Sequence, residues 1–181
     1  LYAYDDNGNM IKMEEYINRQ GANSGQIDKY NYYCEYFYDY KNRLEAIDSG
    51  NARKEYVYDG LDRVTNEVVR NADGDAVLTN QYTYKDAVVG GENVTTYQVA
   101  SKEAVSNNYR GTWVYEYDDN GNIISIRDGT GTNAKAITYV YDSANQLVRE
   151  NNPYADTTWV WTYDDAGNII SKKRYNYTTG T

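Results

Sequence analysis

The stretch Tyr115-Glu116-Tyr117-Asp118-Asp119-Asn120-Gly121-Asn122-Ile123 contains a strand, a tight turn and the start of a returning strand. Aromatic residues occupy every second position up to Tyr117, and a period of two is typical of a strand. Turn chemistry follows, because Asp bonds its own backbone and Gly takes a positive φ without a Cβ clash. We therefore predict a three-residue loop, residues 119–121, that pairs Asp118 with Asn122 and Tyr117 with Ile123.

The same unit recurs along the chain, and this recurrence is the main feature of the sequence. The pattern Tyr-x-Tyr-Asp begins at residues 2, 36, 56, 115 and 139, with variants at 82 and 161. Its second aromatic residue falls at positions 4, 38, 58, 84, 117, 141 and 163, at unequal spacings. The sequence thus indicates one fixed hairpin design joined by connections of variable length.

Two further positions in the unit fit the turn. Four residues after the second aromatic residue stand the types that best tolerate the left-handed region: Gly8, Asn42, Asp62, Gly121, Asn145 and Gly167. Six residues after it stand apolar residues: Met10, Leu44, Val64, Ile123, Leu147 and Ile169. The unit at Tyr84 lacks both features, so we predict a later turn at Gly90-Gly91 in a longer hairpin near residues 81–99.

Turn residues and breaks in strand alternation indicate the connections between the hairpins. We expect turns at residues 48–51 and 71–74, with Asp73-Gly74 as a two-residue hairpin turn. Residues 20–27 and 128–133 are expected to be connections, and residues 101–108 a polar loop or a short helical turn. Pro153 is expected at a corner between strands, because proline cannot donate to a sheet ladder.

Composition supports an all-β fold in a single domain, residues 1–181. The chain has 23 Tyr but one Phe and one Pro, and tyrosine combines an apolar ring with a polar tip that can be hydrated. Seven units of two strands predict an antiparallel meander of about fourteen strands, in a twisted, coiled and open ribbon. We also expect contacts mainly between neighbouring hairpins, and unpaired edge strands that favour self-association.

Several function classes have little support. Net charge is −9 with dispersed basic residues, which argues against nucleic-acid binding, and no apolar run is long enough to insert in a membrane. The chain has no His, and it shows no metal-ligand or nucleotide motif, so no metal, cofactor or catalytic residue is predicted. Cys34 is interpreted as a small packed residue. A glycosidase-like pair of carboxylates stays open as an alternative.

An aromatic stripe is the strongest candidate for ligand binding. It consists of Trp113, Tyr115, Trp159, Trp161 and Tyr163. Such rings stack on sugar rings while Asp and Asn bond hydroxyl groups, so a carbohydrate-binding module using this face is the alternative function. The simpler interpretation is cross-strand packing along the ribbon, which the repeat itself requires.

The repeated Tyr-x-Tyr-Asp-x-x-Gly-Asn-Ile pattern resembles the YD-repeat, or RHS-repeat, family. Matching copies stand at residues 2–10, 115–123 and 161–169, and weaker ones at 36–44, 56–64 and 139–147. The family includes bacterial Rhs and wall-associated proteins, toxin-complex subunits and teneurins. In that family such repeats build a β-sheet strip that spirals into a hollow shell, which often encloses a C-terminal toxin or serves in contact or carbohydrate binding at a cell surface.

The resemblance implies a non-enzymatic structural segment of a secreted or cell-surface bacterial Rhs-like protein. Its expected partners are the neighbouring repeats of the parent protein, an enclosed toxin or a cell-surface glycan. Because the chain begins at Leu1 inside a repeat, we expect it to be a fragment of a longer protein. The Asp-Pro motifs of the segment that closes many such shells are not found, since Pro153 follows Asn152.

Overall fold

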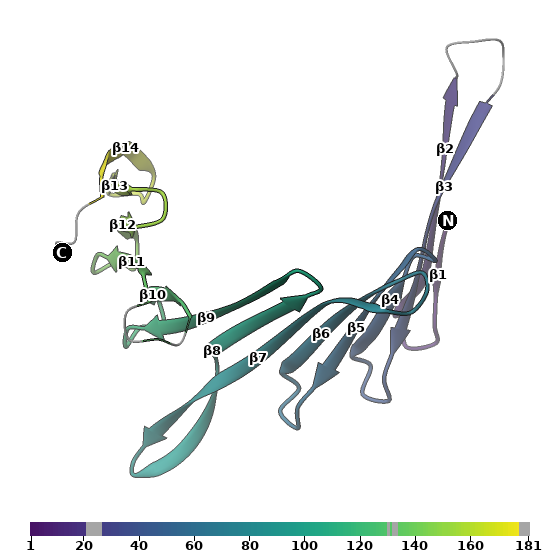
Figure 1. Cartoon of the computed structure of the whole chain (residues 1–181), viewed down its shortest axis with the longest axis horizontal. Helices are drawn as coiled ribbons and strands as arrows, with labels where there is room; N and C mark the ends of the chain where they lie inside the picture. The colour runs from purple at the N-terminus through teal and green to yellow at the C-terminus, as the bar shows by residue number, and fades with distance from the viewer. Residues whose placement is uncertain (21–26, 130, 132–133, 178–181) are drawn as a thin grey trace. The chain divides into compact units, whose positions relative to one another are not determined.

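A computed structural model describes residues 1–20, 27–129, 131 and 134–177 (Figure 1). Every regular element in these residues is a strand, and the strands follow one another in a single sheet in the order of the sequence, from β1 to β14. All pairings with a determined register are antiparallel. The predicted all-β antiparallel meander of about seven hairpins is therefore confirmed, and the order is open, with β1 and β14 at its two ends.

The strands differ widely in length. Their bounds are β1 Tyr2–Tyr4, β2 Met10–Gln20, β3 Ile27–Tyr38, β4 Leu44–Asp48, β5 Ala52–Tyr58, β6 Val64–Asn71, β7 Ala76–Val89, β8 Glu92–Ser106, β9 Tyr109–Tyr117, β10 Ile123–Asp128, β11 Ala136–Tyr141, β12 Leu147–Asn152, β13 Thr157–Tyr163 and β14 Ile169–Asn176. The chain divides into two compact units, residues 1–81 with 104–109 and residues 82–103 with 110–181. A single domain and a coiled ribbon stay predictions.

The turn of the repeat has the expected geometry. In the hairpin of β9 and β10, the amide of Gly121 donates to the carbonyl of Asp118 at 3.0 Å, and the amide of Asp118 donates to the carbonyl of Asn122 at 3.0 Å. Tyr117 pairs with Ile123, as predicted, and a register shift follows the pair. The six left-handed positions have positive φ: Gly8 84°, Asn42 60°, Asp62 63°, Gly121 87°, Asn145 61° and Gly167 84°.

The atypical hairpin turns where glycines permit it. β7 and β8 meet at Gly90 and Gly91, whose φ angles of 61° and 87° are both positive, as a two-residue type I′ turn requires. The later turn predicted for the unit at Tyr84 is therefore confirmed. The hairpin is longer than predicted, since its strands extend from Ala76 to Ser106.

Two predicted connections were wrong. Residues 101–106 belong to β8, and the chain turns at residues 107–108, so the polar passage is strand and not a loop. Ala104 there is 6% exposed, and the hydroxyl groups of Thr83 and Ser101 lie 2.7 Å apart, so alternate polar side chains are used in strand contacts. Asp73-Gly74 is not a two-residue turn.

The turn after β6 instead repeats the three-residue design. The amide of Gly74 donates to the carbonyl of Asn71 at 3.1 Å, and the amide of Asn71 donates to the carbonyl of Asp75 at 3.0 Å. Asn71 takes the place that Asp has in the other units, because an amide oxygen accepts the same backbone hydrogen bonds. The sequence contained this copy, but the missing Tyr-x-Tyr made it hard to recognise.

One further predicted connection lies in the described part of the chain. Pro153 lies between β12 and β13, as expected for a corner. Most of the predicted connection at residues 20–27 and residues 130, 132 and 133 of the predicted exit lie outside the described residues.

The buried hydrophobic residues of the described part are small. They are Cys34, Ala46 and Ala104, with exposed fractions of 4%, 0% and 6%. Most tyrosines of the repeat pattern are half-buried instead. The sheet therefore depends on contacts made by half-buried rings between neighbouring strands, since few large side chains are fully withdrawn from water.

Candidate functional site

An aspartate cap fixes each turn of the repeat. The carboxylate oxygen Oδ1 of Asp118 accepts the backbone amides of Asn120 at 3.0 Å and Asn122 at 2.8 Å. Its Oδ2 accepts the side-chain amide of Asn122 at 3.0 Å. These hydrogen bonds, that of the Asn122 side chain above all, lower the pKa of Asp118 because they favour its charged form.

The cap is the same at the other turns of this design. Oδ1 accepts two backbone amides, two and four residues later, at Asp5, Asp39, Asp59, Asn71, Asp142 and Asp164. The Asp of the Tyr-x-Tyr-Asp motif is thus a structural group that satisfies its own turn. This accounts for the motif without any chemistry on a substrate.

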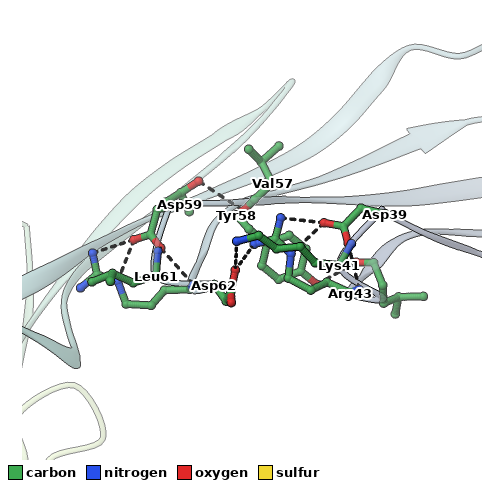
Figure 2. A network of polar contacts seen from close by, with 11 residues as sticks. Asp39, Lys41, Arg43, Val57, Tyr58, Asp59, Leu61 and Asp62 are labelled. Atoms are coloured by element: carbon green, nitrogen blue, oxygen red, sulfur yellow. Dashed lines mark hydrogen bonds and ion pairs between the residues drawn. The ribbon is translucent and has the colours of Figure 1, made fainter.

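Neighbouring turns are also joined to each other by side chains. The guanidinium of Arg43 binds Asp39 of its own turn, with Nε to Oδ2 at 2.7 Å, and donates to Asp62 of the next turn through Nη1. Lys41 Nζ reaches the same Oδ1 of Asp62 at 3.0 Å. Figure 2 shows both basic side chains extending from one turn to the carboxylate of the next.

Asparagine makes the equivalent contact elsewhere. Nδ2 of Asn9 donates to Oδ1 of Asn42 at 3.2 Å, and Nδ2 of Asn122 donates to Oδ1 of Asn145 at 2.8 Å. The acceptors Asn42, Asp62 and Asn145 are the three of the six left-handed repeat positions that are not glycine. A positive φ costs each of them more conformational free energy than it would cost glycine, and each accepts a hydrogen bond from the preceding turn.

The second tyrosine of the repeat forms a second link between hairpins, here called the tyrosine clamp. Its hydroxyl donates to a backbone carbonyl of the preceding hairpin, which in four cases is that of the aliphatic residue six positions after the preceding second tyrosine. The clamps described are Tyr38 to Met10 at 3.0 Å, Tyr58 to Leu44 at 2.7 Å, Tyr117 to Val99 at 3.0 Å, Tyr141 to Ile123 at 3.0 Å and Tyr163 to Leu147 at 2.7 Å.

The clamp explains the choice of tyrosine over phenylalanine at this position. From the sequence we expect a hydrated tyrosine hydroxyl, whereas in the structure the hydroxyl of the second tyrosine donates to a backbone carbonyl. The sequence contained one signal for it, namely 23 Tyr against one Phe, since a purely apolar role does not distinguish the two residues.

The aromatic stripe lies in the second unit, on β9 and β13. Tyr115 pairs with Ile126, which pairs with Ile137, so these three residues share one face of the sheet. Tyr139, two residues after Ile137, lies on the same face. It pairs with Glu150, which pairs with Trp159, so Trp159 lies on this face as well. Three strands lie between β9 and β13, so their aromatic groups are roughly 19 Å apart at about 4.8 Å per strand. The stripe is thus two separate aromatic groups on one face.

Packing within the sheet already occupies part of this stripe. Trp113, Tyr115, Trp159, Trp161 and Tyr163 are all half-buried. The rings of Trp159 and Trp161 are 6.5 Å apart, and Lys172 Nζ lies 4.3 Å and 5.3 Å from their centroids. Tyr163 forms the clamp to Leu147, and burial raises the pKa of Tyr115. These contacts favour the packing interpretation.

The opposite face carries a polar hollow of about 300 Å³ between β12, β13 and β14. It is lined by Arg149, Thr158, Val160 and Tyr175. Two of these residues bind the buried Asn151, whose Oδ1 accepts hydrogen bonds from Nε of Arg149 and from the hydroxyl of Thr158, both at 2.9 Å. No local sequence signal indicates this network, because Arg149, Asn151 and Thr158 lie on two strands.

The described residues contain neither a metal-binding cluster nor a membrane-spanning helix. They contain no group of three or more His, Cys, Asp or Glu side chains placed to hold a metal ion. They also contain no helix with the length and apolar character to cross a membrane.

Comparisons with solved structures place the fold among known β-sheet proteins. A crystal structure of TcdB2-TccC3 without the hypervariable C-terminal region is 17% identical, with a TM-score of 0.50 over 96% of this chain and 11% of that chain. A structure of TcdB2-TccC3-Cdc42 is 18% identical, with a TM-score of 0.49 and the same shares covered. A porin-like protein from Bacteroides uniformis ATCC 8492 is 11% identical, with a TM-score of 0.50 over 98% of this chain and 87% of that chain. At these identities the likeness concerns the fold alone.

Comparison with protein families gives the more specific result. A search of curated proteins found no match. This chain spans about a tenth of the TcdB2-TccC3 chains. The family model for the RHS Repeat matches residues 117–157 and 141–179, which contain the units at Tyr117, Tyr141 and Tyr163. As the repeated motif predicted, residues 117–179 match the model of the RHS-repeat family.

Proposed function

We propose that the chain is a non-enzymatic scaffold, a length of β-sheet wall in a larger secreted or cell-surface Rhs-like protein of bacterial origin. The observation that carries this proposal is that the side chains of the repeat motif act on the repeat itself. Its Asp caps the turn, its left-handed Asn or Asp accepts from the preceding turn, and its second tyrosine binds the preceding hairpin. A sequence whose repeated residues serve its own neighbours supports a structural role.

The finer part of the proposal is that the wall encloses a C-terminal toxin or mediates contact at a cell surface. The match of residues 117–179 to the RHS-repeat family model and a fold like that of TcdB2-TccC3 support it. A continuous sheet suits this role, because every internal strand has two hydrogen-bonded neighbours and leaves few sites for a protease.

Limited proteolysis of the full-length polypeptide tests enclosure. The wild type is compared with a variant in which Tyr38, Tyr58, Tyr141 and Tyr163 are replaced by Phe. Enclosure predicts that segments after the repeats resist protease in the wild type and are cleaved faster in the variant. A matched variant carries Phe at the exposed Tyr2, Tyr4, Tyr40 and Tyr175. Equal cleavage of those segments in all three proteins would show that the wall protects nothing.

A scaffold role predicts that the aromatic face does not bind carbohydrate. Because Lys172 lies over both Trp159 and Trp161, we expect no change of tryptophan fluorescence when cell-wall or host glycans are added. Saturable quenching that is lost in Trp161→Ala would favour the alternative, a carbohydrate-binding module on this aromatic face.

A further inference from the structure

A small hollow, here called the rim hollow, lies within the first unit, residues 1–81 with 104–109. Its volume is about 210 Å³, and the turns after β4 and after β6 frame it. These turns lie at the same rim of the sheet, because β4 and β6 run in the same direction. Arg53 of β5 and Arg70 of β6 line the hollow, and both strands have a hydrogen-bonded neighbour on either side.

The two arginines lie directly opposite each other. Arg53 pairs with Arg70 across β5 and β6, and like charges in this position destabilise an antiparallel pair. On its other side Arg70 pairs with Ala76, so no acidic residue stands opposite it in either neighbouring strand. Arg53 pairs with Asp48, but Nη1 and Oδ2 are 3.4 Å apart, which is long for a hydrogen bond. The arrangement lowers stability, so the scaffold alone does not account for it.

One carboxylate holds both guanidinium groups in place. Oε1 of Glu55 accepts Nε of Arg53 at 3.1 Å, and its Oε2 accepts Nε of Arg70 at 2.8 Å. The hydrogen bond from Arg70 lowers the pKa of Glu55, so this carboxyl group is ionised at neutral pH. The ring of Phe37 lies 4.8 Å from the centre of the Arg53 guanidinium and restricts its orientation. The pair is therefore preorganised.

Each guanidinium keeps a donor group for a ligand. Nη1 of Arg53 donates to Asp48, and Nη1 of Arg70 donates to the carbonyl of Gly74 at 3.1 Å. Within the part of the chain that the structure describes, Nη2 of neither arginine has a hydrogen-bond partner. The two side chains are 34% and 36% exposed, so a ligand from solution can reach them.

The arginines do not belong to the repeat motif. Five residues before the second aromatic residue, the other units have Tyr33, Thr79, Thr112, Ala136 and Thr158 in place of Arg53. Six residues after the aliphatic residue, they have Tyr16, Gly50, Gly129, Pro153 and Tyr175 in place of Arg70. The rim hollow is thus specific to one hairpin, and its role goes beyond the structural role of the repeat.

We propose that the rim hollow binds the carboxylate of an acidic peptide side chain through Arg53 and Arg70. The planar fork of a guanidinium matches the two oxygens of a carboxylate. Asp48 and Glu55 already balance the charges of the two arginines, which favours a monoanion over sulfate or phosphate. The described residues that line the hollow include no aromatic ring, on which a sugar would stack, and this favours a peptide over an acidic sugar.

NMR titration of the intact chain tests the proposal, with the Nε–Hε resonances of Arg53 and Arg70 as the readout. The probe is the α-amide of N-acetylglutamate, whose single carboxylate is that of a glutamate side chain, and chloride keeps the ionic strength constant. We expect saturable shifts of both resonances, and none with the neutral α-amide of N-acetylglutamine. Shifts that fail to saturate, or that both probes cause, would overturn the proposal. Tighter binding of glucuronate or of sulfate would contradict the assignment to a peptide carboxylate.

Three variants locate the bound carboxylate. Arg70→Gln should weaken binding about tenfold, the effect of losing charge-assisted hydrogen bonds. Arg53→Lys keeps the charge but lacks the fork, so we expect binding about threefold weaker, and this variant keeps the test decisive if Arg70→Gln fails to fold. Arg110→Gln is the matched control, because Arg110 also pairs with a glutamate, Glu103, and should leave binding unchanged. Undiminished binding in both rim variants, or an equal loss in Arg110→Gln, would show that the carboxylate binds elsewhere.

Discussion

At the scale of single residues, the left-handed position of the turn shows how one site meets two demands. Glycine meets the conformational demand alone, as at Gly121, whose φ is 87°. Asn145 pays a conformational cost at φ 61° and accepts a hydrogen bond from Asn122 in return. Glycine at this position therefore lowers the free energy of the left-handed backbone, whereas Asn or Asp adds a hydrogen bond to the preceding turn.

Gly121→Val is expected to destabilise the chain by about 1–3 kcal/mol, because a β-branched residue is strained at positive φ. Gly60→Val is the matched control, since Gly60 also lies in a turn but has no positive φ and no atom near an added Cβ. Thermal or urea unfolding measures both. An unchanged stability in Gly121→Val would show that the left-handed assignment is wrong.

Asp118 and Asp164 are expected to make stability depend on pH. Hydrogen bonds from Asn122 and Asn168 lower their folded pKa, so each contributes stability that is present above the unfolded pKa, about 3.9, and lost as the pH falls through the folded pKa. The double variant Asp118→Asn, Asp164→Asn should keep the caps, as Asn71 does, and lose part of this dependence.

Melting temperatures measured from pH 7 to pH 2 provide the comparison. The wild type should lose stability more steeply below about pH 4 than the double variant does. Parallel curves for the two proteins would show that these carboxylates do not contribute through their ionised form.

At the scale of the elements, the hairpin was predicted well and the connections less so. Tyr117, Asp118 and Ile123 sufficed for the strand, turn and pairing, because a turn of this type depends on local residues alone. Residues 101–106 were misjudged because a polar strand looks like a loop until its partners are known. The clamps and the hollow beside Arg149 join residues of different strands, so sequence reasoning had no local signal for them.

Asn145 tests the link between neighbouring hairpins. Asn145→Ala should destabilise the chain by about 1–2 kcal/mol, since it loses the hydrogen bond from Asn122 and keeps the cost of positive φ. Asn145→Gly loses only the hydrogen bond and should be milder, because glycine accepts the backbone geometry. Equal stability of the two variants in urea unfolding would contradict this account of the position.

At the scale of the whole chain, the hairpins that follow one another in the sequence also lie next to each other in the sheet. Few described hydrophobic side chains are fully buried, so a central core contributes little. Stability in such an array is approximately a sum over hairpins and the junctions between them. Two side-chain contacts recur at those junctions, the links between neighbouring turns and the tyrosine clamp, and we expect the clamp to contribute most to stability.

The most direct test compares two variants with equal changes. One replaces Tyr38, Tyr58, Tyr141 and Tyr163 by Phe and removes four clamps; the other makes the same change at Tyr2, Tyr4, Tyr40 and Tyr175, which are 51% to 89% exposed. Urea unfolding of the first should show a loss of about 4 kcal/mol, at about 1 kcal/mol for each hydrogen bond, and of the second a loss near zero. Equal stability of the two variants would contradict the claim that tyrosine hydroxyls hold the repeats together.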